Sequence, residues 1–388
     1  MSKYFVSIKE IQSNLLFKLI LALIFLSIYF MFSSTVILSI DIYGNPYRFG
    51  VMHSIWLVIG YFFLNFFYKI DIQSLKKYSF VFYFVSFLFL SILALSKFFP
   101  CESALPFAPC TKGAIRWFVL NPKPLPEIPF VGQITFQPSE LAKISIVILL
   151  SYIFSSTKFN ITEKIYRASL FIMPLILLVF FQPNKSTAFI LFFIFCSIFY
   201  ANGENFKKLI YFLIPFFILF VFFMVNNAYS YSRVSTFLDT NSNESENYHQ
   251  NQALISIGSG GLTGVGVGKS RQKFSFLPEI PADSIFALIS EEVGFIGSFL
   301  IIFIYFSIVY QGFKISKYQK DKFSQLVGIG ISSWVAIQAL INFFSMTGLI
   351  PLTGIPLPIL SYGGSSTIFV MIALGILLNL SKNVYDKR

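Results

Sequence analysis

Charged and metal-binding side chains are scarce in this sequence. Asp, Glu, Lys and Arg make up 12% of the 388 residues, whereas a soluble domain carries roughly 25%. Two histidines and three cysteines are too few and too scattered for a Cys/His metal framework. With 56% hydrophobic residues and a mean hydropathy of +0.73, the chain cannot hide its apolar surface in a water-soluble fold. Lipid must therefore be the solvent for most of the chain.

Apolar runs long enough to cross a bilayer as helices alternate with polar loops along the chain. They predict an all-α, polytopic integral membrane protein of about ten transmembrane helices, forming a single domain over residues 1–388. The sixth run is short and suggests a tilted or kinked helix. The first run is too long for a cleaved signal peptide, so we expect a signal anchor. The expected spans are 15–40, 49–68, 78–98, 139–156, 166–182, 188–201, 209–228, 284–310, 325–349 and 363–381.

Lysine and arginine predict the orientation, because cytoplasmic loops carry the excess of both. With the N-terminus inside, 18 of the 29 lysines and arginines fall in inner segments and 10 in outer ones. Both termini are therefore expected on the cytoplasmic side. Two long loops, 99–138 and 229–283, then lie outside, the second between helices seven and eight. The net charge of +12 follows this loop pattern and does not indicate nucleic-acid binding.

The first outer loop carries two features. Cys101 and Cys110 could form a disulfide there, while Cys196 lies within a span, where packing is the simpler interpretation. Arg116 and Trp117 fit an interfacial anchor, because Trp prefers that depth and Arg snorkels to it. A cation beside a flat apolar surface also suits a lipid-linked phosphate. Spacing alone leaves both interpretations open.

The sequence Gln-Pro-Ser-Glu-Leu-Ala-Lys opens the fourth expected span. Pro138 and Ser139 fit a helix start, and Glu140 in the first turn complements the helix dipole. Glu140 and Lys143 can pair at i,i+3, which would make a lysine tolerable inside the membrane. The pair is either a structural ion pair or part of a site, since ionisable residues at this depth are functional candidates.

A short polar turn, residues 182–187, joins the fifth and sixth expected spans on the outer side. Its one cation is Lys185. The segment is either a simple tight turn or, with Lys185 reaching an anionic ligand, part of a binding site.

The end of the second long loop is rich in glycine and basic residues. Gly-Lys-Ser at 268–270 is not a P-loop, because Thr263 stands where that motif needs glycine and no strand precedes it. What remains is a flexible, basic loop that carries Lys269, Arg271 and Lys273.

The sequence Pro-Glu-Ile-Pro-Ala-Asp leads from this loop into the eighth span. Pro281 fits the first turn of that helix, which puts Asp283 near its N-terminus, where the dipole keeps a carboxylate ionised. Asp283 is either a helix-stabilising acid or a general base at the mouth of a membrane cavity, with Glu279 as a neighbouring acid. Glu291 and Glu292 lie about two turns deeper, where carboxylates are costly.

Residues 351–366 contain three prolines and three glycines, which cannot continue a helix. Such a backbone is tolerated at membrane depth where it lines a cavity or is buried in protein. The sequence favours a cavity, with Ser361 and Ser365 as candidate substrate-binding side chains.

Taken in order, these segments resemble the SEDS family (shape, elongation, division and sporulation proteins), which includes FtsW and RodA. The most specific stretches are QPSELAK, IGSGGLTGVGVGKSRQK to SEEVGFIG, and PLTGIPLPILSYGGSS, and the likeness covers nearly the whole chain. It implies a peptidoglycan glycosyltransferase in the bacterial cytoplasmic membrane. Such an enzyme joins lipid II, a polyprenyl-diphosphate-linked disaccharide-pentapeptide, into glycan strands on the outer face. GVGVGKSRQK favours the FtsW (division) type, whereas PLTGIPLP is common in RodA (elongation) proteins.

The resemblance also implies partners and site residues. A class B penicillin-binding protein and other divisome or elongasome membrane proteins are the expected partners. The family's proposed catalytic carboxylate falls on Asp283, the base of an inverting single displacement. A divalent cation (Mg²⁺ or Mn²⁺) could share the diphosphate charge, and no organic cofactor or protein metal site is expected. The expected substrate-binding residues are Arg116, Trp117, Glu140, Lys143, Lys185, Lys269, Arg271, Lys273, Glu279, Ser361 and Ser365.

The sequence departs from the family pattern at three places. The family's His-Thr before the Asp is Pro281-Ala282 here. The family's QPDxGT turn is QPNKST, with Asn184 in place of the acid and Lys185 added. Residues 120–131 look like an insertion. Two other functions stay open: a lipid II flippase, which would form no glycan product, and a non-catalytic scaffold that recruits a penicillin-binding protein.

Overall fold

The computed structural model describes residues 15–96, 105–111, 114–122, 124–126, 132–203, 206–225, 237, 244–274, 277 and 279–385. These ranges are mostly helical, which confirms the predicted all-α class. Two short strands, β1 (Phe118–Val119) and β2 (Thr135–Phe136), pair antiparallel on either side of the expected insertion. The helices are α2 (Leu15–Tyr43), α3 (Arg48–Lys69), α4 (Ile72–Lys77), α5 (Ser79–Ser96), α6 (Pro138–Ser155), α7 (Ile161–Phe181), α8 (Lys185–Ala201), α9 (Phe206–Val225), α11 (Glu244–Ser259), α12 (Ile285–Lys317), α13 (Lys322–Met346) and α14 (Gly364–Tyr385).

Eight helices of the described chain are long and apolar enough to cross a membrane. The shorter apolar helices Lys185–Ala201 and Phe212–Val225 correspond to the sixth and seventh expected spans. The prediction of about ten spans is thereby confirmed, including the short sixth one. The start of α6 at Pro138 is confirmed as well.

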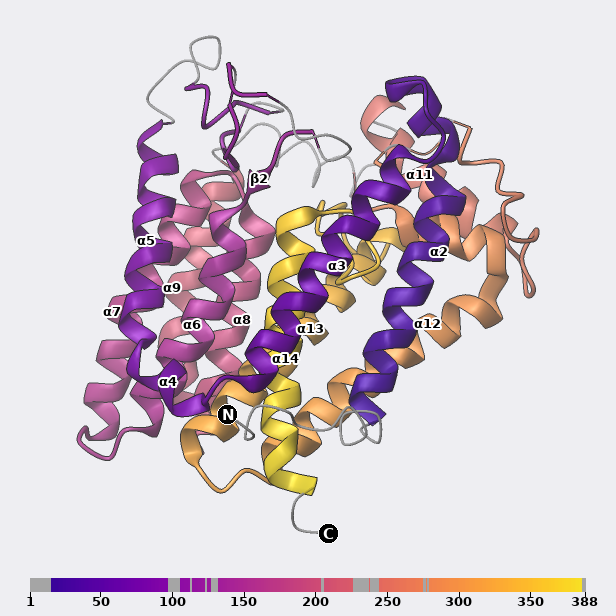
Figure 1. Ribbon diagram of the computed structural model, residues 1–388. Helices are drawn as coiled ribbons and strands as arrows, with labels where there is room; N and C mark the ends of the chain where they lie inside the picture. The colour runs from indigo at the N-terminus through magenta and orange to yellow at the C-terminus, as the bar shows by residue number, and fades with distance from the viewer. Residues whose placement is uncertain are drawn as a thin grey trace.

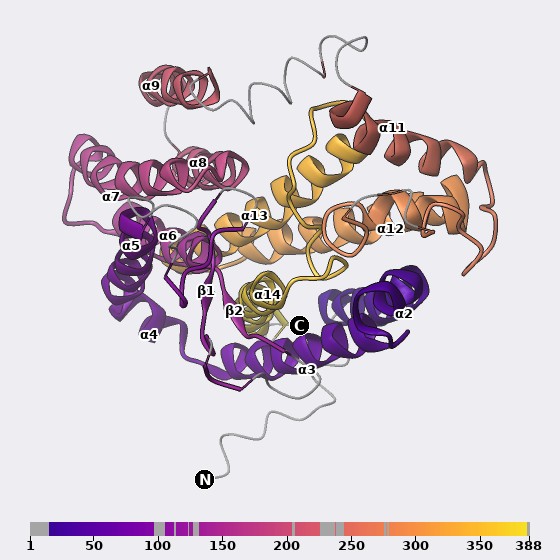
Figure 2. The ribbon, with the colours of Figure 1, turned by 90° about the horizontal axis from the view of Figure 1, so that it is seen from above.

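Helices α6, α13 and α14 form the centre of the bundle (Figure 2). Their apolar windows are 83%, 72% and 89% buried, against 28% to 44% for the other five long spans. Small residues allow this close packing, as is usual between membrane helices. A Cβ on Gly375 of α14, for example, would lie 2.5 Å from the carbonyl oxygen of Leu64 in α3. The central helices therefore provide a rigid base for the segments at their ends.

The segments expected on the outer side gather toward one end of the bundle (Figure 1). Helix α2 begins and α14 ends at the opposite end, while the β1–β2 pair and α11 lie at the end away from them. The segment between α13 and α14 (residues 347–363) returns into this same half. The segments that the sequence places on the outer side therefore lie toward the same end of the bundle in the structure.

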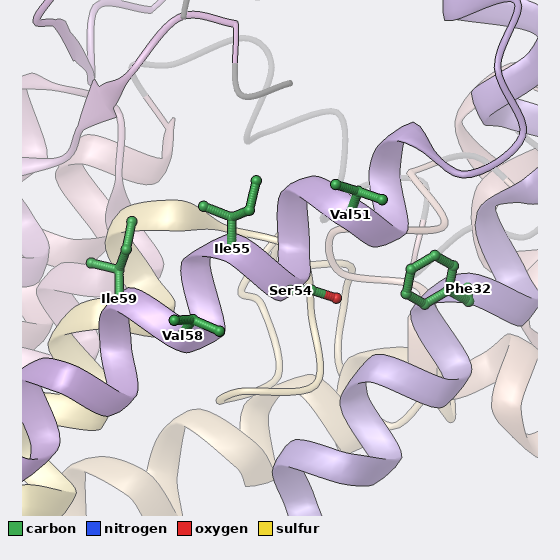
Figure 3. A pocket seen from close by; sticks show the side chains of 6 residues that line it. All are labelled: Phe32, Val51, Ser54, Ile55, Val58 and Ile59. Atoms are coloured by element: carbon green, nitrogen blue, oxygen red, sulfur yellow. The ribbon is translucent and has the colours of Figure 1, made fainter. Parts of the chain in front are cut away.

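An apolar depression lies on α3 next to α2, on the flank of the bundle (Figure 3). Its volume is about 300 Å³, and it contains no ionisable side chain, so it is separate from the polar segments described below. The lining residues are Phe32, Val51, Ser54, Ile55, Val58 and Ile59.

The cysteines fall into two states. Cys110 is disulfide-bonded, whereas Cys196 is free. Cys101, the expected partner of Cys110, lies outside the described residues.

Candidate active site

Asp283 lies directly before Ser284, the N-cap residue of α12, and is 7% exposed. The side-chain amide of Asn342, on α13, holds its main chain. Its Nδ2 donates to the carbonyl oxygen of Asp283 (2.9 Å) and to that of Ile355 (2.8 Å). One buried amide thus ties the start of α12 to the α13–α14 segment. The position of Asp283 near a helix start is confirmed.

Pro281 is placed differently from the prediction. The amides of Ala282 and Ser284 both donate to the carbonyl oxygen of Glu279 (3.0 and 3.4 Å), which makes a tight turn ahead of the helix. Because this turn delays the helix start, Pro281 lies before α12 and not in its first turn, so that part of the prediction is wrong. Glu279 itself is exposed. Asp283 follows this turn at the point where the chain enters the helix.

Gly354 faces the carboxylate of Asp283. A Cβ at Gly354 would lie 3.8 Å from Asp283 Oδ2, and the backbone there has a φ of +69°, a conformation that favours glycine. The amide of Tyr362 also donates to the carbonyl oxygen of Pro281 (2.6 Å). The α13–α14 segment therefore contacts the Asp283 region at two separate points.

His249 reaches the start of α12 from another element, α11. Its Nε2 lies 2.7 Å from Ser284 Oγ, directly beside Asp283. Pro281 and Ala282 precede Asp283 in the sequence, and the histidine beside the start of α12 comes from a different part of the chain. Sequence reasoning missed His249, because 35 residues separate it from Ser284 and no local pattern links them.

Glu140 and Lys143 form the predicted ion pair, at 2.8 Å between Oε1 and Nζ. Lys143 Nζ also donates to Gln338 Oε1 (2.9 Å), which accepts a second bond from Trp334 Nε1 (2.8 Å). Gln338 Nε2 in turn donates to the carbonyl oxygen of Pro356 (3.0 Å). This network joins α6, α13 and the α13–α14 segment, which favours the structural alternative for the pair.

Arg116 holds the turn between α7 and α8. Its Nε and Nη2 donate to the carbonyl oxygens of Gln182 (3.1 Å) and Pro183 (2.8 Å). The side chain of Gln182 donates to the carbonyl oxygen of Leu90 in α5 (3.2 Å). Trp117, beside Arg116, is half-buried. Arg116 thus positions the turn that precedes Lys185, and its role in substrate binding stays a prediction.

Lys185 is the first residue of α8 and is 7% exposed. Asn184 caps the helix by accepting from the amide of Thr187 (3.3 Å), and Ser186 Oγ donates to the carbonyl oxygen of Thr353 (3.2 Å). Within the described chain, Lys185 Nζ is buried and has no hydrogen-bond partner. The turn is therefore held by several hydrogen bonds, and its cation has no acceptor among the residues that the structure describes.

Ser361 and Ser365 make contacts within the protein. Ser361 Oγ accepts from the amide of Leu357 (2.7 Å). Ser365 Oγ accepts from the amide of Gln137 (3.2 Å) and donates to the carbonyl oxygen of Thr135 (2.8 Å). Much of the α13–α14 segment is buried against protein partners, where the sequence favoured a cavity lining. Gly354 is exposed and Thr353 is half-buried.

The glycine-rich segment packs closely on a kink in α12. Gly294 has φ +67° and ψ −167°, which interrupts the helix. A Cβ on Gly264 would lie 2.2 Å from the carbonyl oxygen of Glu292, and the amide of Gly266 donates to that same oxygen (3.1 Å). These glycines allow the two backbones to approach closely. The sequence had predicted only a flexible loop here and did not predict this contact.

Glu291 anchors the basic part of the same loop. Its carboxylate accepts from Ser270 Oγ and from the amide of Arg271 (2.9 Å). Lys269 and the Arg271 side chain are exposed, and Lys273 Nζ donates to a loop carbonyl. The backbone of this loop is therefore held by Glu291, about two turns from Asp283, while the charged groups of its three cations make no contact with that carboxylate among the described residues.

A family model described as cell cycle protein, of the FtsW, RodA and SpoVE group, matches residues 13–386. The chain belongs to this family. Among its SEDS relatives, stage V sporulation protein E of Bacillus subtilis is 34% identical over 256 residues, covering 65% of this chain and 70% of the relative. The probable peptidoglycan glycosyltransferase FtsW of Bacillus subtilis is 29% identical over 390 residues, covering 96% and 91%. That of Haemophilus ducreyi is 27% identical over 380 residues, covering 95% and 89%.

Solved SEDS structures share the fold. A chain from a peptidoglycan synthase complex that coordinates polymerization and crosslinking matches with a TM-score of 0.75 and 21% identity, covering 95% of this chain and 97% of that one. The rod shape determining protein RodA of Thermus thermophilus matches with a TM-score of 0.67 and 22% identity, covering 95% and 96%. The bundle is therefore that of a SEDS membrane protein.

Proposed function

We propose that this chain is a peptidoglycan glycosyltransferase that polymerises lipid II at the outer face of the bacterial cytoplasmic membrane. Family membership over residues 13–386 and relatives named probable peptidoglycan glycosyltransferase FtsW support the activity. In the chain itself, the observation that carries the proposal is the placement of Asp283. This buried carboxyl group has its main chain fixed by Asn342 at the junction of α12, α13 and the α13–α14 segment.

The proposed reaction is a single displacement at the anomeric carbon of the donor. The acceptor sugar hydroxyl attacks this carbon while the carboxylate of Asp283 takes the hydroxyl proton. The bond between the anomeric carbon and the diphosphate oxygen breaks, so the configuration inverts and polyprenyl diphosphate leaves with the electron pair. A positioned general base of this kind contributes about 10²–10⁴-fold to the rate. Fixing the main chain of Asp283 holds the base in the required orientation.

A divalent cation, Mg²⁺ or Mn²⁺, would neutralise part of the diphosphate charge. No three His, Cys, Asp or Glu side chains of the described chain converge to hold a metal ion. The described residues therefore form no such metal centre, and in this proposal the ion would be carried by the diphosphate of the substrate. None of the proposed reaction steps depends on this ion.

Replacing Asp283 with Asn removes the base and keeps the shape of the side chain. We expect Asp283→Asn to lower polymerisation of fluorescent lipid II by about 10²–10⁴-fold, because the acceptor hydroxyl then keeps its proton. Purified full-length protein and gel analysis of the glycan products provide the measurement. Asp41→Asn, at an exposed aspartate near the end of α2, is the matched control and should polymerise normally.

Three outcomes would contradict parts of this proposal. Full activity of Asp283→Asn would remove Asp283 from the mechanism. Transfer of lipid II between leaflets without any glycan product would identify a flippase. A chain that makes no product but still recruits a penicillin-binding protein in both variants would be a scaffold.

We further propose the division (FtsW) type, with a class B penicillin-binding protein as partner and both termini in the cytoplasm. The names of the full-length relatives and the similarity to a chain of a peptidoglycan synthase complex support this assignment. Depletion of the native division or elongation polymerase in a host, followed by expression of this chain, separates the two types. Rescue of rod shape without rescue of septation would favour the RodA type. Reporter tags at residue 283 and at the C-terminus test the orientation.

A further inference from the structure

The amino end of α8 carries a lysine, as does that of α13, where Lys322 Nζ donates to the carbonyl oxygen of Ala201. The first amides of a helix lack intrahelical acceptors, and the helix dipole adds a partial positive charge there. Helices α6 and α7 follow the usual rule and place Glu140 and Glu163 in their first turns. Helix α8 places Lys185 there instead. The charge of the Lys185 side chain and the partial positive charge of the helix dipole therefore lie at the same end of α8.

Burial makes this arrangement costly without an anion. Lys185 is 7% exposed, and its Nζ is buried without a hydrogen-bond partner in the described chain. A buried ammonium group without a counter-charge is strongly unfavourable. Its backbone is nevertheless held in place, by Arg116 on one side and by the Ser186–Thr353 bond on the other. The fold therefore maintains a desolvated cation at a helix start.

A second buried polar group lies next to this helix start. Thr353 Oγ1 is buried and has no hydrogen-bond partner among the described residues, and the carbonyl of the same residue accepts from Ser186. The next residue, Gly354, faces the Asp283 carboxylate. Residues 353 and 354 thus connect the start of α8 with the region of the proposed base.

We propose that Lys185, Thr353 Oγ1 and the amides of Lys185 and Ser186 at the start of α8 form the subsite for the diphosphate of the lipid-linked donor, a role that rests on the proposed function. Helix amino ends and ammonium groups bind phosphate oxygens by charge-assisted hydrogen bonds. As the anomeric bond breaks, negative charge grows on the diphosphate, and preformed donors stabilise it there. Asn184, which caps this helix start by accepting from the amide of Thr187, adds no negative charge there.

The test uses inorganic diphosphate as the probe with purified full-length protein. Lys185→Gln should weaken diphosphate binding, measured by calorimetry, about 10- to 100-fold, because it removes a charge-assisted bond. Inhibition of lipid II polymerisation by added diphosphate should weaken by the same factor. Lys185→Arg, which keeps the charge, should restore most of both. Lys164→Gln is the matched control, since Lys164 also lies in the first turns of a helix but donates to the carbonyl oxygen of Phe154; it should bind diphosphate like the wild type.

The outcomes separate this inference from the proposed function. Polymerisation together with wild-type diphosphate affinity in Lys185→Gln would overturn the subsite alone. Diphosphate binding that depends on Lys185, in a chain that makes no glycan, would support the anion site and reject the polymerase. Repeating the titration in nanodiscs of zwitterionic and of anionic phospholipid distinguishes the source of the phosphate. Loss of Lys185-dependent binding in anionic nanodiscs would assign the site to a lipid headgroup and overturn the diphosphate assignment.

Discussion

Two buried lysines of this protein, Lys143 and Lys185, have opposite surroundings. Lys143, in the centre of α6, bonds Glu140 and Gln338 and is 1% exposed. Lys185, at the start of α8, is almost as buried but has no hydrogen-bond partner for its Nζ in the described chain. The first cation is neutralised by the fold. The second is maintained at a cost in stability, as is typical of residues kept for binding or catalysis.

The difference indicates which of the predicted cations contribute to structure and which to substrate binding. Lys143 joins three elements through Gln338, whose amide reaches the carbonyl oxygen of Pro356. Among the described residues, Lys185 bonds none through its side chain. We therefore assign Lys143 to the support of the α13–α14 segment and Lys185 to an external anion.

The largest expected effect is on stability, at Lys143. Lys143→Met should destabilise the protein by about 3–5 kcal/mol, because it leaves the buried carboxylate of Glu140 without its partner. Lys185→Met should be neutral or stabilising, because it removes an uncompensated buried charge. Thermal unfolding of the two purified variants in detergent measures the contrast.

A double variant sharpens this test. Glu140→Gln combined with Lys143→Met should be less destabilised than the sum of the two single variants, since the two residues are coupled. Equal destabilisation by Lys143→Met and Lys185→Met would show that the two lysines are alike and would refute the comparison.

An intermediate effect is expected at Asn342, which links the base to the same segment. Asn342→Leu leaves the carbonyl oxygens of Asp283 and Ile355 without their donor, which costs about 1–3 kcal/mol. It should also lower kcat for lipid II polymerisation about tenfold or more, with little change in KM, because the base loses its fixed position.

Asn379 offers a matched control for this position. It is a buried asparagine near the end of α14 whose Nδ2 likewise donates to two carbonyl oxygens, those of Phe67 and Ile70. Asn379→Leu should cost similar stability and leave kcat unchanged. If both variants lowered kcat equally, Asn342 would have only a structural role.

The parts of this site that could be predicted from the sequence are local. The Glu140–Lys143 pair follows from an i,i+3 spacing, and the start of α6 follows from Pro138, so both were accessible without a fold. Gln338 lies 195 residues from Lys143 and Asn342 lies 59 from Asp283, and no local period connects them. The glycine-rich loop shows the same limit, because its tight contact needs the kink at Gly294 as a partner.

The smallest expected effect is at Thr353, and it tests whether the subsite extends beyond Lys185. Thr353→Val keeps the volume and removes the hydroxyl, so diphosphate affinity should fall about two- to tenfold, the contribution of one uncharged donor. Thr35→Val is the control, because the Thr35 hydroxyl bonds the carbonyl oxygen of Met31 within α2; its affinity should be that of the wild type. Calorimetry with inorganic diphosphate measures both. An unchanged affinity in Thr353→Val, beside a large loss in Lys185→Gln, would restrict the subsite to the ammonium group and the amino end of α8.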